Sequence, residues 1–597
     1  MAAALALLFS LVLRLSAAQS VAAAVATEDD DASSLFTACL ADAGVRNVTP
    51  RSSPAYDAAL RVSVQNLRFA GPTSPKPAAV VVPSSLSELR AAVRCSRASG
   101  LAVRLRSGGH SYEGLSYTTT ENRVPFAVVD LAALAAVRVD PATRTAWVES
   151  GATLGQVYHA VAAATGGGDD TALAFSAGSC PTVGAGGHVA GGGFGLLSRK
   201  HGLAADNVVD AVVVAADGRV LDRTAMGEDV FWAVRGGGGG GWAAVYAWRV
   251  RLSPVPPRVT AFVVNRASEP GGPGSNQVVA RLVSTWQHVA PWLPDAFYLS
   301  AFVGAGLPER QNQTGVISVT FKGLYLGPKH EALQILEARF PEIGLSEDLN
   351  PIEMTWIESV LFFSGLPHGS TVSDLADRVL HTKKYFKAKS DYVRRPTPLD
   401  GLVQAMDLLA KQPKAYVIMD PYGGAMDRVG PADLPFPHRK GNIHGVQYMI
   451  EWTAEDDVHG EEEYMDWLRR FYDFMGPYVS NSPRAAYINY MDLDLGTNNW
   501  SSAIDDGGDG ESSSPNPEVE AARVWGERYF LSNYDRLVRA KTLIDPDNVF
   551  RNAQSIPPLG RRRPSSRVVA TSPRGGTTAT KVVTASNNGT TSSHADS

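Results

Sequence analysis

The sequence predicts an α+β protein that folds as more than one unit. Three observations support this prediction: the chain length, an early alternation of strand and helix, and a change of pattern near the middle. The chain has 597 residues, 44% hydrophobic and 19% charged, which is a globular composition but too long for one ordinary core. Residues 79–106 read as strand, helix and strand, which indicates helices packed on a sheet. A proline-rich run at residues 254–257 marks the boundary with the second half.

The expected elements of the first half are short strands and one clear helix. Ser84 and Glu88 stand at the start of a helix predicted over residues 86–99. Valine-rich stretches predict strands at residues 79–82, 101–106, 127–131, 137–139, 145–149, 208–215 and 248–252.

The second half has a different pattern of expected strands and helices, which is typical of a separate α+β unit. Its expected strands are residues 260–264, 297–302, 315–324, 414–419 and 446–452, and its expected helices are residues 277–288, 330–338, 402–409 and 461–475. Residues 507–515 read as a loop and residues 518–544 as one helical stretch. Few large apolar residues follow, which predicts a disordered tail over residues 560–597.

The N-terminus predicts a signal peptide over residues 1–26. An apolar run at residues 2–13 is followed by small residues, and it is shorter than the roughly 20 residues of a membrane span. The alternative is a frayed alanine-rich end. Glycosylation sequons at Asn47, Asn312, Asn499 and Asn588 favour secretion.

Charge and composition exclude several function classes. The net charge is −5, and the residues after Leu559 carry +5, so the rest carries −10, which argues against a nucleic-acid partner. The histidines are scattered, so we expect no metal site. Neither a phosphate-binding loop of the ATPase type nor a nucleophile elbow is present in the sequence.

Three cysteines are present, and two should pair in an oxidising compartment. Cys39 and Cys95 lie in helix-like stretches, whereas Cys180 lies in a glycine-rich loop. We expect a disulfide between Cys39 and Cys95. The remaining thiol is then either inert and buried or committed to chemistry.

Glycine clusters at residues 106–114, 177–195 and 235–241 are the strongest functional signal. Glycine lets backbone amides approach a ligand, and successive amides can surround a pyrophosphate. The clusters therefore predict a dinucleotide lying across several loops. Gly236, Gly238 and Gly241 match the usual dinucleotide fingerprint, but a strand is expected after them instead of a helix, so that fingerprint fails its context test.

These residues resemble the berberine bridge enzyme-like flavoproteins of plants. The resemblance is carried by residues 106–112 (RSGGHSY) and 180–184 (CPTVG), and by a C-terminal block: residues 487–494, 525–530, 541–542, 545–550 and 554–558. It covers roughly residues 35–559. Residues 487–494 look like the family's strand before a long loop.

The resemblance implies a two-part FAD-binding domain of the PCMH and vanillyl-alcohol-oxidase type. Residues 35–253 and 516–559 would form it, and residues 254–510 would be an inserted α+β substrate domain built on an antiparallel sheet. The flavin would lie at the interface between the two, a usual place for ligand sites.

The resemblance also implies that FAD is held by two covalent bonds, from His110 to the 8α carbon of the flavin and from Cys180 to its C6. The alternatives are a loop histidine that caps backbone groups and a small buried thiol. Ten further residues are implied as cofactor contacts: Arg106, Ser107, Gly108, Gly109, Ser111, Gly184, Gly187, His188, Gly192 and Gly193.

For catalysis, the resemblance points to Tyr490 as base, with Gln447 and Tyr112 beside it. A phenol near its free pKa of about 10 is a poor base unless nearby charge lowers that value. Gly445 stands where some members carry a helper lysine. Packing within a strand is the alternative role for Tyr490, because alternation would put Ile488, Tyr490 and Asp492 on one face.

Val183 occupies the position that controls oxygen access in this family, where valine goes with oxidases; ordinary core packing is its alternative role. We therefore expect hydride transfer from an alcohol such as a monolignol, a carbohydrate hydroxyl or an alkaloid to FAD, with O₂ reduced to H₂O₂. The expected partners are this small molecule and O₂, with no nucleic acid and no membrane, and we expect a monomer.

Two rival functions stay open. Phe194, Gly445 and Trp242 depart from the family pattern and favour a catalytically impaired flavoprotein that acts as a binding or defence protein. A flavin-independent glycan-binding protein is the other rival. The expected location is the apoplast or cell wall, with the vacuole and the endoplasmic reticulum as alternatives.

Overall fold

The computed structural model describes residues 31–120, 125–166, 172–269, 275–305, 307, 316–346, 351–379, 381–498 and 516–560. The signal peptide predicted at residues 1–26 and the loop predicted at residues 507–515 lie outside these ranges, as do the predicted tail from residue 561 onward and the sequons at Asn312, Asn499 and Asn588. Within these ranges, no helix is both long and apolar enough to cross a bilayer.

A first sheet holds the strands of the N-terminal region in the order β1-β2-β4-β3. These strands are β1 (Val48–Pro50), β2 (Ala79–Val81), β3 (Ala102–Arg106) and β4 (Phe126–Asp130), and β2, β4 and β3 run parallel. Helix α3 (Leu86–Ala98) connects β2 to β3, and Ser85 caps it by accepting the N–H of Glu88. The predicted strand, helix and strand are confirmed. Helix α2 (Tyr56–Arg61) lies between β1 and β2 in the chain.

A second, antiparallel sheet follows in the order β5-β6-β10-β8-β9. Its strands are β5 (Val137–Asp140), β6 (Thr145–Glu149), β8 (Val208–Val214), β9 (Val220–Leu221) and β10 (Ala244–Arg251). The accompanying helices are α4 (Leu154–Thr165), α5 (Ala185–Ala190), α6 (Ser198–His201) and α7 (Arg223–Val234), and β7 (Leu173–Ala174) pairs with β11 (Ser253–Pro254). Strand β10 follows the third glycine cluster, so the expectation of a strand there is confirmed.

The second half is built on one large antiparallel sheet in the order β15-β12-β14-β13-β17-β18-β16. Its strands are β12 (Val259–Ala267), β13 (Phe297–Gly304), β14 (Ser318–Tyr325), β15 (Ile352–Met354), β16 (Tyr385–Val393), β17 (Ala415–Pro421) and β18 (His444–Trp452). Its helices are α8 (Gln277–Val289), α9 (Lys329–Arg339), α10 (Trp356–Phe363), α11 (Leu399–Leu409), α12 (Ala425–Arg428) and α13 (Ala454–Met475).

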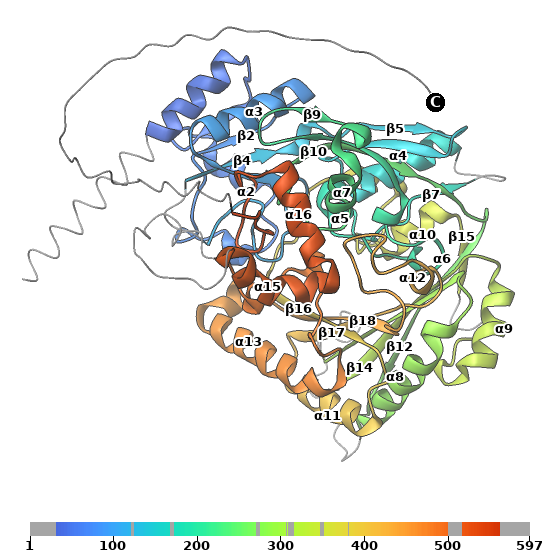
Figure 1. Cartoon of the computed structure of the whole chain (residues 1–597). Helices are drawn as coiled ribbons and strands as arrows, with labels where there is room; N and C mark the ends of the chain where they lie inside the picture. The colour runs from blue at the N-terminus through green and yellow to red at the C-terminus, as the bar shows by residue number, and fades with distance from the viewer. Residues whose placement is uncertain are drawn as a thin grey trace, which may run out of the picture. The chain divides into compact units, whose positions relative to one another are not determined.

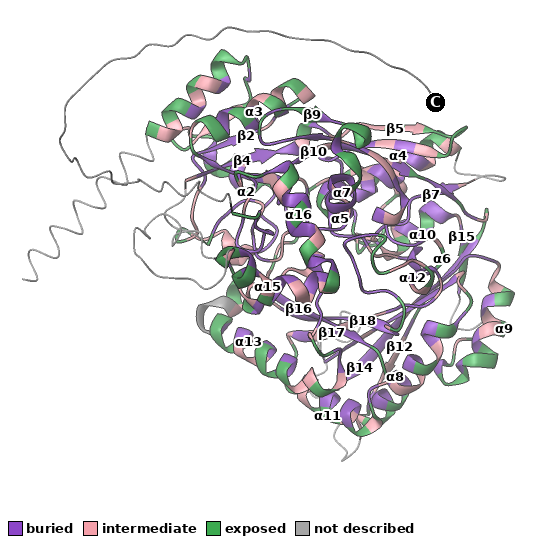
Figure 2. Cartoon of the chain, in the orientation of Figure 1, coloured by how far each residue is buried: buried purple, intermediate pink, exposed green. Residues whose placement is uncertain are grey.

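Helices α8, α9, α11 and α13 cover the outer face of the large sheet (Figure 1). Their apolar sides pack with the strands in one hydrophobic cluster, while their other sides are exposed (Figure 2). The opposite face of the sheet is therefore left to face the glycine-rich loops of the first half. The α+β class and the antiparallel sheet predicted for residues 254–510 are confirmed.

The C-terminal segment returns to the first half, where α16 (Tyr534–Ile544) packs beside α7 (Figure 1). The helical pattern predicted over residues 518–544 is confirmed, although the structure divides it into two helices. Helix α15 (Pro517–Phe530) ends at a turn, η12 (Leu531–Asn533), before α16 (Tyr534–Ile544) begins. Tertiary contacts fix this turn, because the Asn533 side chain donates hydrogen bonds to the carbonyls of Pro431 and Leu434.

The prediction of a strand at residues 487–494 is wrong. The segment forms two short 3₁₀ turns, η10 (Ile488–Tyr490) and η11 (Leu493–Leu495). Asp492 caps η11 by accepting the N–H of Asp494, and its carboxylate binds Lys387 and Lys389 of β16. A side chain that satisfies the local backbone in this way competes with strand pairing.

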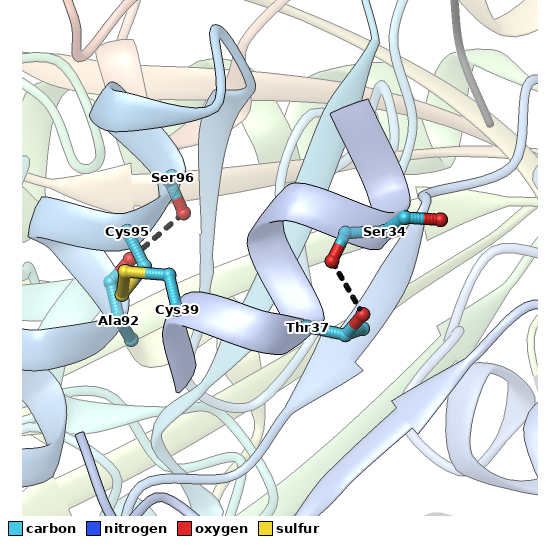
Figure 3. The surroundings of a disulfide bond; sticks show 6 residues. All are labelled: Ser34, Thr37, Cys39, Ala92, Cys95 and Ser96. Carbon is cyan, nitrogen blue, oxygen red and sulfur yellow. Dashed lines mark hydrogen bonds between the residues drawn. A yellow bond between two sulfur atoms is a disulfide. The ribbon is translucent and has the colours of Figure 1, made fainter. Parts of the chain in front are cut away.

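The disulfide between Cys39 and Cys95 joins the helical residues 31–42 to α3 (Figure 3), with the two Cα atoms 5.7 Å apart. The predicted pairing is confirmed, and Cys180 stays free.

Candidate active site

A cavity of about 510 Å³ lies between the glycine-rich loops and the inner face of the large sheet. It brings together residues that are far apart in the chain. Twelve of the predicted site residues line it: Ser107, Gly109, His110, Ser111, Tyr112, Cys180, Val183, Gly184, Gly187, His188, Gln447 and Tyr490.

Four predicted cofactor contacts are placed behind this lining. The buried guanidinium of Arg106 binds Asp130 at 2.6 Å and the carbonyl oxygens of Leu60 and Ala59. Gly108 packs against the Cys180 loop, and Gly192 and Gly193 form a turn that is held by the Tyr487 hydroxyl, which accepts the N–H of Gly193 at 2.9 Å. Their contact with a cofactor stays a prediction.

Gly108 and Gly184 explain how the two loops meet. A β-carbon at Gly108 would lie 2.4 Å from the nitrogen of Gly184, and one at Gly184 would lie 2.3 Å from the nitrogen of Gly108. Only glycine allows the two backbones to approach so closely. This contact places the His110 loop directly against the Cys180 loop.

Thr182 lies between the two residues predicted to hold the flavin. Its hydroxyl is 2.9 Å from Nε2 of His110 and 3.8 Å from Sγ of Cys180, whose side chain is exposed. Burial lowers the pKa of His110 to about 4, so the imidazole is neutral at pH 7. The sequence did not assign Thr182 a role, although it belongs to the quoted CPTVG motif.

His188 is a second neutral imidazole in the cavity wall. Its Nε2 accepts the N–H of Gly178 at 3.1 Å, and burial lowers its pKa to about 4. Because Nε2 is an acceptor, the ring proton resides on Nδ1. His188 can therefore offer one hydrogen-bond donor to a ligand without carrying charge.

The three predicted catalytic residues contact one another in the cavity lining. The ring of Tyr112 stacks on that of Tyr490, with centroids 5.4 Å apart and planes 6° from parallel. The amide of Gln447 on β18 donates to the Tyr112 hydroxyl at 2.6 Å. Burial raises the pKa of Tyr112 and raises that of Tyr490 well above 10.

Asp420 and Tyr298 also line this cavity, and sequence reasoning missed both. Tyr298 on β13 donates its hydroxyl to Oδ1 of Asp420 on β17 at 2.6 Å, and burial raises the pKa of Asp420 to about 6. A signal was present in the sequence, because Asp420 shares a face with Ile418 in an otherwise apolar strand.

The departures noted in the sequence have separate structural roles. Phe194 stacks on Tyr422, with centroids 5.3 Å apart. Gly445 pairs with Asp420 across the β17–β18 ladder. Trp242 is buried away from the cavity lining and donates its indole N–H to the Gly237 carbonyl at 3.2 Å.

The cavity fits a flavin dinucleotide. β-Carbons built at Gly187 and Gly240 would meet no atom within 4 Å, so the backbone there is open to a ligand. An imidazole and a thiol, both able to form covalent bonds, stand close together at one part of the lining. The volume lies in the range of cofactor and ligand pockets.

Comparison with known proteins agrees with this fit. The family model for an FAD binding domain matches residues 77–224, and the model described as berberine and berberine like matches residues 486–557. Berberine bridge enzyme-like D-1 of Nicotiana tabacum is 51% identical, over 84% of this chain and 86% of its own length. This chain belongs to the berberine bridge enzyme-like family.

Other berberine bridge enzyme-like proteins agree along the same span. Reticuline oxidase of Papaver somniferum is 44% identical, over 88% of this chain and 92% of its own length. The structure of berberine bridge enzyme from Eschscholzia californica matches with a TM-score of 0.80 and 43% identity, covering 88% of this chain and 99% of that chain. The protein is therefore an FAD-linked oxidoreductase of the berberine bridge enzyme-like type. The predicted family and fold class and the choice of FAD as cofactor are confirmed, whereas the two covalent bonds to FAD stay a prediction.

Proposed function

We propose that the protein is a secreted oxidase that takes hydride from an alcohol, a carbohydrate or a related small molecule. FAD, attached through His110 and Cys180, would accept the hydride, and O₂ would reoxidise it to give H₂O₂. The observation that carries the proposal is one cavity whose lining holds His110 and Cys180 together with Tyr112, Gln447 and Tyr490.

The attachment is supported by the state of the two residues. Thr182 engages Nε2 of His110, so Nδ1 is the nitrogen left for a covalent bond. The thiol of Cys180 is unpaired and exposed. Once bound, the flavin supplies the hydride acceptor, and the protein supplies position and electrostatics.

Tyr112, Gln447 and Tyr490 are suited to hold the substrate. Gln447 uses its nitrogen on Tyr112, which leaves its amide oxygen to accept a hydrogen bond from a substrate hydroxyl. The stacked rings of Tyr112 and Tyr490 offer a flat apolar surface beside it. Tyr490 is suited to donate a hydrogen bond, because its raised pKa keeps the phenol protonated.

Secretion is supported by features of the first half. The Cys39–Cys95 disulfide suits an oxidising compartment, and the sequon residue Asn47 is exposed. We propose the apoplast or cell wall as the location, and a monomer as the working form.

The test is a flavin assay on the purified protein. We expect yellow protein whose colour survives acid precipitation, and bleaching of the flavin under anaerobic conditions by coniferyl alcohol, cellobiose or (S)-reticuline, with H₂O₂ formed when air is admitted. A yellow protein that none of these compounds bleaches would favour the impaired binding protein. Colourless folded protein would contradict the proposal.

A further inference from the structure

Asp420 is a carboxylate that lines the cavity and has no ion pair to a base in the described part of the chain. It lies on the inner face of β17, and its one described side-chain contact is the hydroxyl of Tyr298. Among the described residues, no basic group contributes to its electrostatic environment. Buried aspartates elsewhere are paired with bases: Asp130 with Arg106, Asp391 with Arg484, and Asp545 with Lys541.

Burying a carboxylate without a basic partner raises the free energy of the folded state. Such a group in a cavity wall is therefore a candidate for a functional role. The other titratable groups around it are neutral phenols or are already occupied. Tyr298 comes from β13, Tyr392 from β16, Tyr422 follows β17, and Tyr487 and Tyr490 come from the η10 segment. Asp391, which also borders this space, is held by two hydrogen bonds from Arg484.

Tyr490 is poorly placed to accept a proton. Burial first, and then the neighbouring Tyr112, Asp420, Tyr487 and Tyr298, raise its pKa well above 10. No cation lies among these causes, and Gly445, opposite Asp420 in the ladder, offers no side chain to supply one. Among the interactions given for Tyr490 in the described residues, none is with a positive charge that would stabilise a phenolate.

We propose that Asp420 is the catalytic base of the reductive half-reaction. This inference rests on the proposed oxidase function. For an alcohol substrate, the O–H bond breaks and its proton passes to the free Oδ2 of Asp420, which becomes a carboxylic acid. The C–H bond of the carbon that bears this hydroxyl also breaks. Its hydrogen and two electrons would go to the bound flavin as hydride, and the substrate becomes a carbonyl compound.

The surroundings of Asp420 suit this role. Tyr298 binds Oδ1 and so fixes the carboxylate, with Oδ2 left to accept the proton. Burial raises the pKa of Asp420 to about 6, close to a working pH, which is the range in which a general base is most effective. Asp420 and Gln447 lie on neighbouring strands, two residues out of direct register, which is within reach of one small substrate.

The test compares two rival bases by the pH dependence of flavin reduction. Anaerobic stopped-flow rates are measured from pH 4.5 to 8 with the compound among coniferyl alcohol, cellobiose and (S)-reticuline that bleaches the wild type. We expect the wild-type rate to rise through about pH 6. Asp420→Asn should lower the plateau rate about 100-fold and remove this rise, whereas Tyr490→Phe should keep the rise.

Two further variants separate a base from a positioning residue. Asp420→Ala should regain rate in proportion to added formate, because formate can enter the vacated space and accept the proton. Tyr298→Phe should keep the pH step but move its midpoint, because one hydrogen bond to the carboxylate is lost. An Asp420→Asn variant with a wild-type rate and pH step, or a step abolished by Tyr490→Phe alone, would overturn the proposal.

A measurement without substrate keeps the two proposals distinguishable. Infrared titration should show a carboxyl band with a midpoint near pH 6 that is lost in Asp420→Asn, while the contribution of Asp391 remains in both proteins. If no compound bleaches the flavin, the oxidase proposal fails, and a band near pH 6 still supports Asp420 as the available proton acceptor. A midpoint near pH 4 would overturn the inference in either case.

Discussion

The hydroxyl of Thr182 lies 2.9 Å from Nε2 of His110. The same hydroxyl lies 3.8 Å from Sγ of Cys180. One small side chain therefore contacts both residues that the proposed function assigns to flavin attachment, and it orients the imidazole so that Nδ1 remains available.

Replacing Thr182 should impair attachment of the flavin. Thr182→Val keeps the shape of the side chain but removes the hydroxyl, so the imidazole loses the contact that fixes its orientation. We expect a smaller fraction of covalent flavin, measured by intact mass and by colour retained after acid precipitation. Thr182→Ser keeps the hydroxyl and is the matched control; equal covalent loading in all three proteins would contradict the role given to Thr182.

Replacing Val183 should slow the reaction with O₂. Val183 is half-buried and lines the cavity, and a longer side chain in a well-packed wall removes small spaces. We expect Val183→Leu to lower the rate of reoxidation of the reduced flavin by about tenfold, a free-energy change of about 1.4 kcal/mol. The rate of flavin reduction by substrate should change much less. An unchanged reoxidation rate would exclude Val183 as the residue that controls oxygen access.

Replacing Lys387 should destabilise the fold. Its buried ammonium binds Glu113 and lies 2.7 Å from Asp492, so Lys387→Met leaves buried carboxylates without this partner. We expect a loss of about 3–5 kcal/mol in the free energy of unfolding, measured with urea. Arg523→Met removes ion pairs on the surface of α15 and should cost about 1 kcal/mol or less; similar losses for both variants would contradict this reasoning.

Acid should destabilise the protein in part through His438. Burial lowers the pKa of His438 to about 3, whereas the unfolded chain has about 6.5. Below pH 6.5 the unfolded chain binds a proton at His438, whereas the folded protein does not. The contribution of His438 to the free energy of unfolding is therefore fully present above pH 6.5 and is lost as the pH falls towards 3. The expected slope from this group is about 1.4 kcal/mol per pH unit.

His438→Gln isolates this contribution. Its amide nitrogen can replace Nε2, which bonds to the Tyr529 carbonyl at 2.9 Å, but it does not titrate. Urea unfolding at pH 7, 6 and 5 should show the wild type losing stability faster than the variant. Parallel curves would mean that His438 does not bind a proton on unfolding in this range.

Local patterns predicted much of the fold. A continuous apolar run identified β2, and strand-like apolar segments identified β3 and the central strands of the large sheet. The strand predicted at residues 487–494 was wrong because the two turns around Asp492 depend on partners from another part of the chain. The division of the helical stretch at Leu531–Asn533 depends on distant partners in the same way.

The sequence by itself placed His110 and Cys180 within glycine-rich segments, because residue types and their spacing can be read directly from it. That the backbones of Gly108 and Gly184 meet is decided by the tertiary structure. Only the tertiary structure decided that Thr182 contacts both His110 and Cys180, and that Asp420 reaches the cavity lining beside Tyr298 with no ion pair to a base among the described residues. The physical reason is that burial and charge pairing are set by neighbours, and those neighbours come from strands more than a hundred residues apart.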